Sequence, residues 1–406
     1  MLIKRMIAAK NREPLPLPEF IFLMALLTSL VAFSIDAVLP ALNQIGAELG
    51  ASSPQHSYLV ISLFFAGMAF GQLFFGPFSD ARGRRLTILV GLAIFILGTL
   101  ICYYASSMEM MLFGRLVQAF GVSGPRIASM ALIRDLYVGD AMARVMSFIM
   151  VVFILVPMIA PLIGQGVMLM AGWRHIFTLF LLVTLLSGIW FFSRQSETLP
   201  RDKRKPFTWH QFFVGCIGLF KNKVVMGYSL ALGFIFGAFL GYLSASQTVF
   251  QVIYDTGEYF PLLFALLAFS IGLASLCNGM LVMRLGMQRL TFLALIGTVI
   301  FSFVLSGLVW HFDGVPPLFV FVSVMFIGFF CIGVLFGNLN AMAMAPLGHI
   351  AGLGAAFIGS FTSFIAVPIA SFIANFINAS LLPIALGFLL FSSLAFLAVE
   401  YGNRHQ

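Results

Sequence analysis

Charged side chains are scarce in this sequence: Asp, Glu, Lys and Arg make up only 9% of the 406 residues, whereas 61% are hydrophobic. Water-soluble globular domains carry charge on about a quarter of their residues, so this composition excludes that class. Cysteine is also rare, with 4 residues that lie in or beside apolar segments and lack the spacing of metal ligands. We therefore expect the cysteines to act as small hydrophobic side chains.

Long apolar runs fill most of the chain instead. A helix needs roughly 20 mainly apolar residues to cross the hydrocarbon core of a membrane. The runs are continuous and do not alternate with polar residues, which excludes membrane-spanning strands. The sequence therefore predicts an all-α membrane protein with twelve transmembrane helices, at 19–41, 57–78, 86–104, 109–133, 145–169, 175–192, 224–248, 259–282, 290–310, 316–340, 352–376 and 380–399.

Lys and Arg are distributed unevenly among the segments that connect these helices. If the N-terminus is cytoplasmic, the segments on the opposite face contain Arg174 as their single Lys or Arg, and acidic residues gather there. Because Lys and Arg accumulate on the cytoplasmic side of membranes, we predict that both termini are cytoplasmic. The net charge of +8 then reflects attraction to anionic lipid and not nucleic-acid binding. The first run is too long for the h-region of a signal peptide and lacks a small-residue cleavage site, so we expect it to stay as a helix.

The chain divides near its middle into two similar halves. We predict a six-helix half over 1–193, a cytoplasmic linker over 194–223 that contains an amphipathic helix, and a second six-helix half over 224–406. Two glycines between the second and third helices of the first half recur between the second and third helices of the second half. The paired positions are Gly76 with Gly279 and Gly83 with Gly286. Parallel repeats of six helices are typical of transporters whose two halves rock against each other.

Several short motifs carry a resemblance to a known family. They are SIDAVLPAL in the first helix, GQLFFGPFSDARGRR after the second, GRLVQAFG and ALIRDLY in the fourth, VPMIAPLIGQ in the fifth, and GWRHIF. This set, between residues 34 and 177, resembles the major facilitator superfamily and, within it, the Bcr/CflA exporters that confer resistance to bicyclomycin and chloramphenicol. The sequence differs from the usual family pattern at Ala81, which follows Asp80, at Ala160 before Pro161, and at Met283 in the second hinge.

The resemblance implies a twelve-helix fold of two parallel repeats in the inner membrane of a bacterium. It also implies alternating access and exchange of a drug for protons. By resemblance, the loop after the second helix latches the two halves on the cytoplasmic side. The helix 5 motif of such antiporters falls on Pro157, Pro161 and Gly164, which we expect to bend that helix and let it pack closely, although Pro and Gly are also common in membrane helices.

The loop after the second helix concentrates charge in a hinge between two apolar segments. Gly76 and Gly83 allow a tight turn and close helix approach. We expect Asp80 to meet an arginine at the inner end of helix 4, with Arg126 and Arg134 as candidates, or the positive N-terminus of helix 11. Positive-inside topology requires no acid at this place, so Asp80 is predicted to be functional. Two roles stay open for the hinge arginines, as parts of the latch or as topological anchors: Arg82, Arg84 and Arg85.

Charges within the spans are costly in a membrane and indicate function. Three are predicted: Asp36 in helix 1, and Arg115 and Arg126 in helix 4. Asp36 and Arg115 lie at comparable depth, so we predict an ion pair between them, which either couples to protons or merely fixes packing. Gln118 shares the helical face of both arginines and is predicted to line a central cavity. Phe33, one turn before Asp36, is the aromatic side chain most expected in that cavity.

These observations predict proton-coupled efflux of small, largely apolar drugs, with Asp36 as the residue that exchanges the proton. We expect a monomer whose partners are the drug, protons and membrane lipid, with the proton gradient as energy source, and with no cofactor and no metal site. A proton-coupled transporter of a specific metabolite, as exporter or importer, is the alternative. A channel would need pore-lining rings, and a membrane enzyme would need a nucleophile, metal cluster or phosphate loop, none of which is visible in the sequence.

Overall fold

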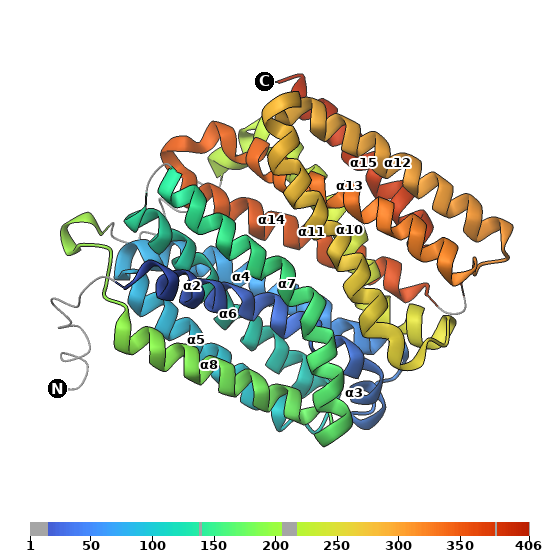
Figure 1. Cartoon of the computed structure of the whole chain (residues 1–406), viewed down its shortest axis with the longest axis horizontal. Helices are drawn as coiled ribbons and strands as arrows, with labels where there is room; N and C mark the ends of the chain where they lie inside the picture. The colour runs from blue at the N-terminus through green and yellow to red at the C-terminus, as the bar shows by residue number, and fades with distance from the viewer. Residues whose placement is uncertain (1–14, 138–139, 205–216, 378–379, 406) are drawn as a thin grey trace.

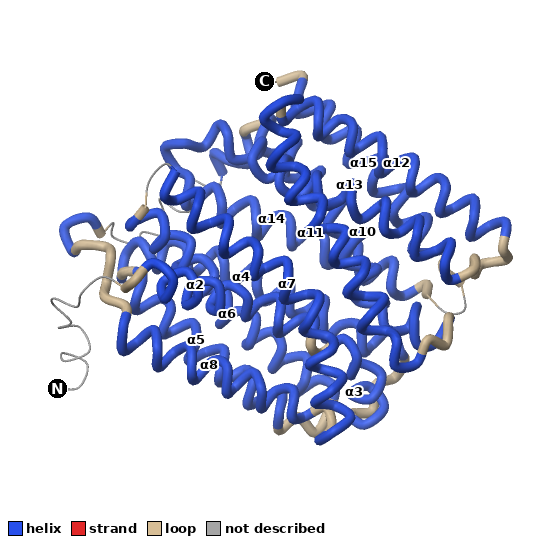
Figure 2. Tube along the Cα trace, in the orientation of Figure 1, coloured by secondary structure: helices blue, strands red, loops and turns tan. Residues whose placement is uncertain are grey.

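The computed structural model describes residues 15–137, 140–204, 217–377 and 380–405. Within these ranges the chain forms helices and connecting loops and contains no strand (Figure 2). The prediction of an all-helical protein is confirmed.

The first half contains six long helices in chain order. After η1 and α3 extend the first of them, the others follow with short connections. Their bounds are α2 Leu17–Asp36, η1 Leu39–Ala41, α3 Leu42–Glu48, α4 Pro54–Arg82, α5 Arg84–Tyr103, α6 Met108–Leu136, α7 Asp140–Ala171 and α8 Arg174–Arg194.

The second half repeats this order. Its bounds are α10 Lys223–Gln247, η3 Thr248–Ile253, η4 Gly257–Tyr259, α11 Phe260–Leu285, α12 Met287–His311, α13 Leu318–Met344, η5 Ala345–Ile350, α14 Ala351–Asn375 and α15 Leu382–Asn403. Among the described residues, 11 helices are long and apolar enough to cross a membrane, and Val156–Ala171 within α7 forms a shorter apolar helix. The chain is therefore a multi-pass membrane protein, as the apolar runs predict.

The two halves form two neighbouring groups of helices (Figure 1). They meet along two seams, where α4 packs against α14 and α7 packs against α11. The start of α2 and the end of α15 lie at the same end of the bundle (Figure 1). The connections from α4 to α5 and from α11 to α12 also lie there, and we call it the hinge end.

The first span differs from the prediction, because its α-helix does not run on to residue 41. It ends at Asp36, and the chain continues through the short η1 into α3. Proline has no backbone N–H, so Pro40 cannot donate the helical hydrogen bond to the carbonyl oxygen of Asp36. The break places the one predicted membrane acid at the end of a helix.

Both hinges have the same backbone geometry. Gly83 ends α4 and precedes α5 with a φ of 101°, and Gly286 ends α11 and precedes α12 with a φ of 79°. Positive φ values of this kind favour glycine, because a side chain would be strained there. The repeat read from Gly83 and Gly286 therefore corresponds to a repeat in structure.

The linker between the halves is described in part. α8 ends at Arg194 and α10 begins at Lys223. Residues 205–216, where the amphipathic helix is predicted, lie outside the described residues, and residues 217–221 are helical. The domain boundaries at 193 and 224 stay predictions.

Candidate functional site

Arg84 is the centre of the first hinge. Its Nη1 atom lies 2.6 Å from Oδ1 of Asp80 and donates to Oγ of Ser79 at 3.0 Å. Its Nε atom lies 2.9 Å from Oδ2 of Asp135, at the end of α6. Arg84 is buried, and it joins the end of α4 to the start of α5 and the end of α6.

The prediction that Asp80 meets an arginine at the end of α6, the fourth long helix, is therefore wrong. Helix α6 contributes the acid Asp135 there, because Arg84 has turned inward between the two carboxylates. Arg134 is exposed, and neither it nor Arg126 contacts Asp80 among the described residues. The side chains at 348–352, at the start of α14, lie outside the described ones, so contact of Asp80 with that helix end stays a prediction.

A linker residue that the sequence analysis missed caps the same hinge. The carboxylate of Glu197 accepts hydrogen bonds from the backbone N–H groups of Arg84 at 2.9 Å and Arg85 at 3.2 Å. Gly83 offers no capping side chain, so an acid from elsewhere satisfies the positive N-terminus of α5. The Arg85 Nη2 atom donates to the carbonyl of Phe192 at 2.8 Å. Arg82 is exposed, so the three hinge arginines occupy different environments.

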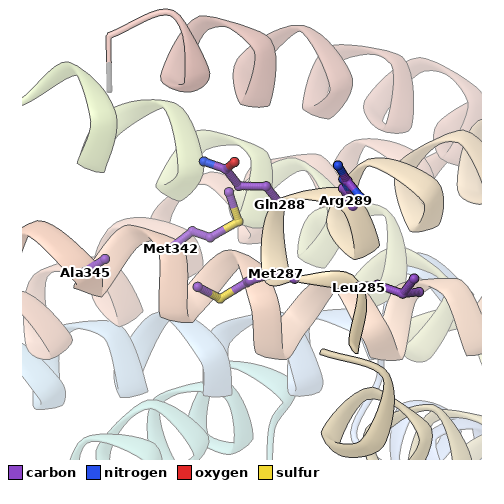
Figure 3. Close-up of a pocket in the computed structure, with 7 residues that line it drawn as sticks. Leu285, Met287, Gln288, Arg289, Met342 and Ala345 are labelled. Carbon is purple, nitrogen blue, oxygen red and sulfur yellow. The ribbon is translucent and has the colours of Figure 1, made fainter. Parts of the chain in front are cut away.

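The second hinge is built differently. Gly286 again precedes the helix and, like Gly83, offers no capping side chain of its own. A pocket of about 350 Å³ lies beside it. Figure 3 shows the side chain of Met342, in α13, pointing toward Gln288 of α12. Arg289 is the next residue of α12 and also lines the pocket. Among the described residues, no ion pair is formed at the second hinge, in contrast to the acid and base network of the first.

Asp36 lies in the first span with 5% of its surface exposed. No hydrogen bond or ion pair joins its carboxyl group to any residue that the structure describes. Phe33 packs its ring edge-on against Phe180 of α8, with 5.3 Å between ring centroids, and so lies within the first half. An acid that is buried without a counter-charge must either be protonated or meet a charge in another conformation.

Arg115 is not the partner of Asp36, so the predicted ion pair is wrong in this conformation. The Nη1 atom of Arg115 donates to Oε1 of Gln118 at 2.7 Å, and Nε donates to the carbonyl of Val60 at 3.2 Å. The guanidinium also stacks over Phe64 at 4.3 Å. These contacts direct Arg115 toward α4 and not toward Asp36 in α2.

Gln118 completes this cluster inside the first half. Its Nε2 atom donates to Oγ1 of Thr99 in α5 at 2.8 Å. Both Gln118 and Arg115 are fully buried. The polar stripe of α6 therefore ties α4, α5 and α6 together here, and Gln118 does not line a central cavity. The sequence placed these residues on one helical face correctly but could not tell which neighbour that face meets.

The predicted helix 5 motif lies on α7, and its Gly164 packs against the first span beside Asp36. α7 continues through Pro157 and Pro161, which stay within one helix. A Cβ atom added to Gly164 would overlap the backbone carbonyl oxygen of Ala37. The absence of a side chain at Gly164 thus lets α7 touch the first span one residue beyond Asp36.

We expect Gly164→Ala to reduce stability and transport together. The new methyl group must push α7 away from the first span, and overpacking of this kind costs roughly 1–3 kcal/mol. Thermal unfolding of the purified protein and transport in proteoliposomes measure the two effects. Gly166→Ala is the matched control, because nothing lies within 4 Å of a Cβ at that position. Equal behaviour of the two variants would show that the contact with Ala37 is unimportant.

The halves touch at both ends of the seams. Toward the hinge end, a Cβ at Gly76 of α4 would lie 3.3 Å from that of Ala356 in α14. Farther along, Ser360 donates to the carbonyl of Ala69 at 2.7 Å. The structure is therefore closed at the seam between α4 and α14.

At the opposite end, Gln247 connects the two halves. Its Nε2 atom donates to the carbonyl of Pro40 at 2.6 Å, and its Oε1 atom accepts from the backbone N–H of Asn43 at 3.0 Å. Next to it, Tyr58 donates to Oγ1 of Thr248 at 2.7 Å. Helix α10 changes to a π-helix at Thr248, a local distortion that is frequent at functional sites. Contacts between the halves are thus present toward both ends of the bundle.

We expect Gln247→Leu to open this end more often. The change keeps a similar volume but removes two hydrogen bonds between the halves, worth about 0.5–1.5 kcal/mol each, so the balance shifts roughly 5- to 150-fold. Labelling of Ala41→Cys by a membrane-impermeant maleimide, in a background without the native cysteines, measures the opening. Gln251→Leu is the control, because Gln251 bonds Gln247 within the second half at 2.7 Å. Unchanged labelling in Gln247→Leu would contradict a gating role.

Comparisons with known proteins agree with this architecture. A family model described as Major Facilitator Superfamily matches residues 24–371. An uncharacterized MFS-type transporter of Bacillus subtilis, YdgK, is 31% identical over 344 residues, which cover 83% of this chain and 84% of the relative. A bicyclomycin resistance protein homolog of Haemophilus influenzae is 34% identical over 277 residues, covering 68% of this chain and 69% of the relative.

More distant matches cover less sequence or only the fold. The multidrug resistance protein MdtL of Salmonella typhi is 33% identical over 189 residues, 45% of this chain and 48% of the relative. The human organic anion transporter MFSD10 superimposes with a TM-score of 0.69 at 18% identity, covering 96% of this chain and 100% of that chain. The xylose transporter XylE of E. coli, in a partially occluded inward-open conformation, gives 0.75 at 13% identity and covers 96% and 97% of the two chains.

The names of the sequence relatives agree with the drug-resistance subgroup that the motifs predict. The matched families are transporters and not enzymes. With a family model that spans most of the sequence, the chain belongs to the major facilitator superfamily.

Proposed function

We propose that this protein exports small, largely apolar drug molecules across the inner membrane of a bacterium in exchange for protons. In this proposal the hinge end faces the cytoplasm, together with both termini, and the protein works as a monomer without a bound cofactor. The halves rock about the two seams, so that the hinge end and the opposite end open in turn.

The observation that carries the proposal is the environment of Asp36. It is a buried acid without a counter-charge, at a helix break that lies between Gly164 of α7 and the Pro40 contact of Gln247. Opening the contact at Gln247 would bring water to this carboxyl group, whereas closing it would remove water. A carboxyl group that alternates between such environments can bind a proton on one side and release it on the other. The drug-resistance names of two relatives support a drug as the counter-substrate.

The test uses purified protein in liposomes with an imposed pH gradient. We expect drug accumulation against its gradient when the compartment that receives the drug is acidic, and no accumulation when the gradient is dissipated. Susceptibility of drug-sensitive cells that express the chain identifies suitable compounds. Accumulation that ignores the pH gradient, or net uptake of a metabolite with no effect on drugs, would overturn the proposal.

A further inference from the structure

Arg126 is a charged residue within a span. It takes part in neither the hinge network nor the Arg115 cluster. It lies inside α6, nearly three turns before that helix ends at Leu136. Its Nη1 atom contacts the sulfur of Met68 at 3.3 Å. A thioether is only a weak hydrogen-bond acceptor, so this contact does not compensate a positive charge.

The rest of the Arg126 guanidinium has no partner among the described residues. Arg126 is partly buried, whereas Arg115 is fully buried. Apart from the contact with Met68, no described residue accepts a hydrogen bond from the N–H groups of Arg126.

Three arginines at the ends of the described spans are matched by acids. Arg84 pairs with Asp80 and Asp135, and Arg194 pairs with Glu19 at 2.9 Å. Arg174 pairs with Glu48. An unpaired charge in the interior costs several kcal/mol, and ionisable residues inside a membrane mark substrate pathways by default. Where no described residue pairs with such a charge in this conformation, a bound molecule can supply the counter-charge.

Met68 places Arg126 beside the seam between the halves. Phe65 and Gln72 lie one turn before and after Met68 on the same flank of α4. The Phe65 ring packs against Phe236 of α10 with 5.2 Å between centroids. A Cβ at Gly359 of α14 would overlap the amide oxygen of Gln72. Transporters built from two repeats hold their substrates at such a seam.

We propose that Arg126 binds the acidic group of a transported molecule, so that the preferred substrates are small aromatic or aliphatic molecules that carry a carboxylate. This inference rests on the proposed function, because it assigns a chemical class to the exported compound. The planar guanidinium matches a carboxylate with two parallel N–H···O bonds, and charge-assisted bonds of this kind are roughly twice as strong as neutral ones. The apolar side chains around the seam suit the rest of such a molecule.

The test compares acids with their neutral amides as ligands of the purified full-length protein. The pairs are 2-naphthoate with 2-naphthamide, and nalidixate with its primary amide, at neutral pH where the acids are ionised. Binding is measured from the thermal stabilisation that each ligand produces. We expect each acid to bind at least about tenfold more tightly than its amide. Arg126→Gln should remove this preference, and Arg126→Lys should keep part of it.

Arg404→Gln is the matched control, because it makes the same change at an exposed arginine directly after α15 and should keep the full preference. A wild-type protein without a preference for acids, or a preference that survives in Arg126→Gln, overturns the inference. Equal losses for acids and amides in Arg126→Gln also overturn it, since they would indicate a packing role. The proposed function fails by a different result: acids bind, but the pH gradient drives no export.

Discussion

Asp36→Asn is expected to abolish pH-driven accumulation of drug in proteoliposomes while leaving the protein folded in the membrane. The amide has nearly the same size as the carboxyl group but cannot take up or release a proton at working pH. Because no described residue forms an ion pair with Asp36, the change leaves no unpaired partner behind. Exchange of labelled for unlabelled drug across the membrane, which needs no proton movement, should therefore continue.

The expected loss is large because the proton is the proposed source of energy. One elementary charge that crosses 100 mV supplies about 2.3 kcal/mol, which sustains a drug gradient of roughly 50-fold. Asp36→Asn should reduce that gradient to the passive level. Asp313→Asn makes the same chemical change in an exposed loop and should transport normally. Full accumulation in Asp36→Asn would move proton coupling to another residue, and loss of drug exchange would indicate a structural role.

Much of the fold follows from the sequence because the membrane constrains it strongly. Apolar runs of the required length can only be helices in lipid, so the spans were predictable one by one. The first span is the instructive exception. Its apolar run continues past Asp36, and only Pro40 signals that the helix ends early. Hydropathy does not detect this break, whereas the missing N–H of proline does.

The candidate site was less predictable, because sequence spacing gives depth along a helix but not the neighbour that a side chain meets. Asp36 and Arg115 match in depth, yet Arg115 finds Gln118 one turn away and the carbonyl of Val60 in α4. Glu197 lies more than a hundred residues from the hinge that it caps. Gln247 joins the halves through backbone groups of Pro40 and Asn43. Because such backbone groups do not depend on the side chain, the residue types at these positions do not indicate the contact. Apart from the local bond between Arg115 and Gln118, each missed contact joins segments that are distant in sequence.

Arg84→Gln is expected to open the hinge end and to lower transport, and it separates a latch from an anchor. The change removes the ion pairs with Asp80 and Asp135 and leaves these two carboxylates near each other without the cation between them. The end of α4 then loses its fixed position. Gly76 lies less than two turns before that end and packs against Ala356 of α14, so the seam should loosen there. A charge-assisted contact is worth about 1.5–3 kcal/mol, enough to shift a two-state balance at least roughly 10-fold.

Arg82→Gln is the control that decides between the two roles. Arg82 and Arg84 lie in the same hinge, and each substitution removes one positive charge, but Arg82 is exposed while Arg84 is buried in the network. If the hinge arginines only anchor the chain at the cytoplasmic surface, the two variants should behave alike. If Arg84 is part of a latch, only Arg84→Gln should expose Ala356→Cys to a maleimide added from the hinge end. Asp80→Asn should show a smaller opening, because the side chain of Asp80 is 47% exposed and its ion pair is screened by water. Equal labelling in Arg82→Gln and Arg84→Gln would leave the anchor as the role of these arginines.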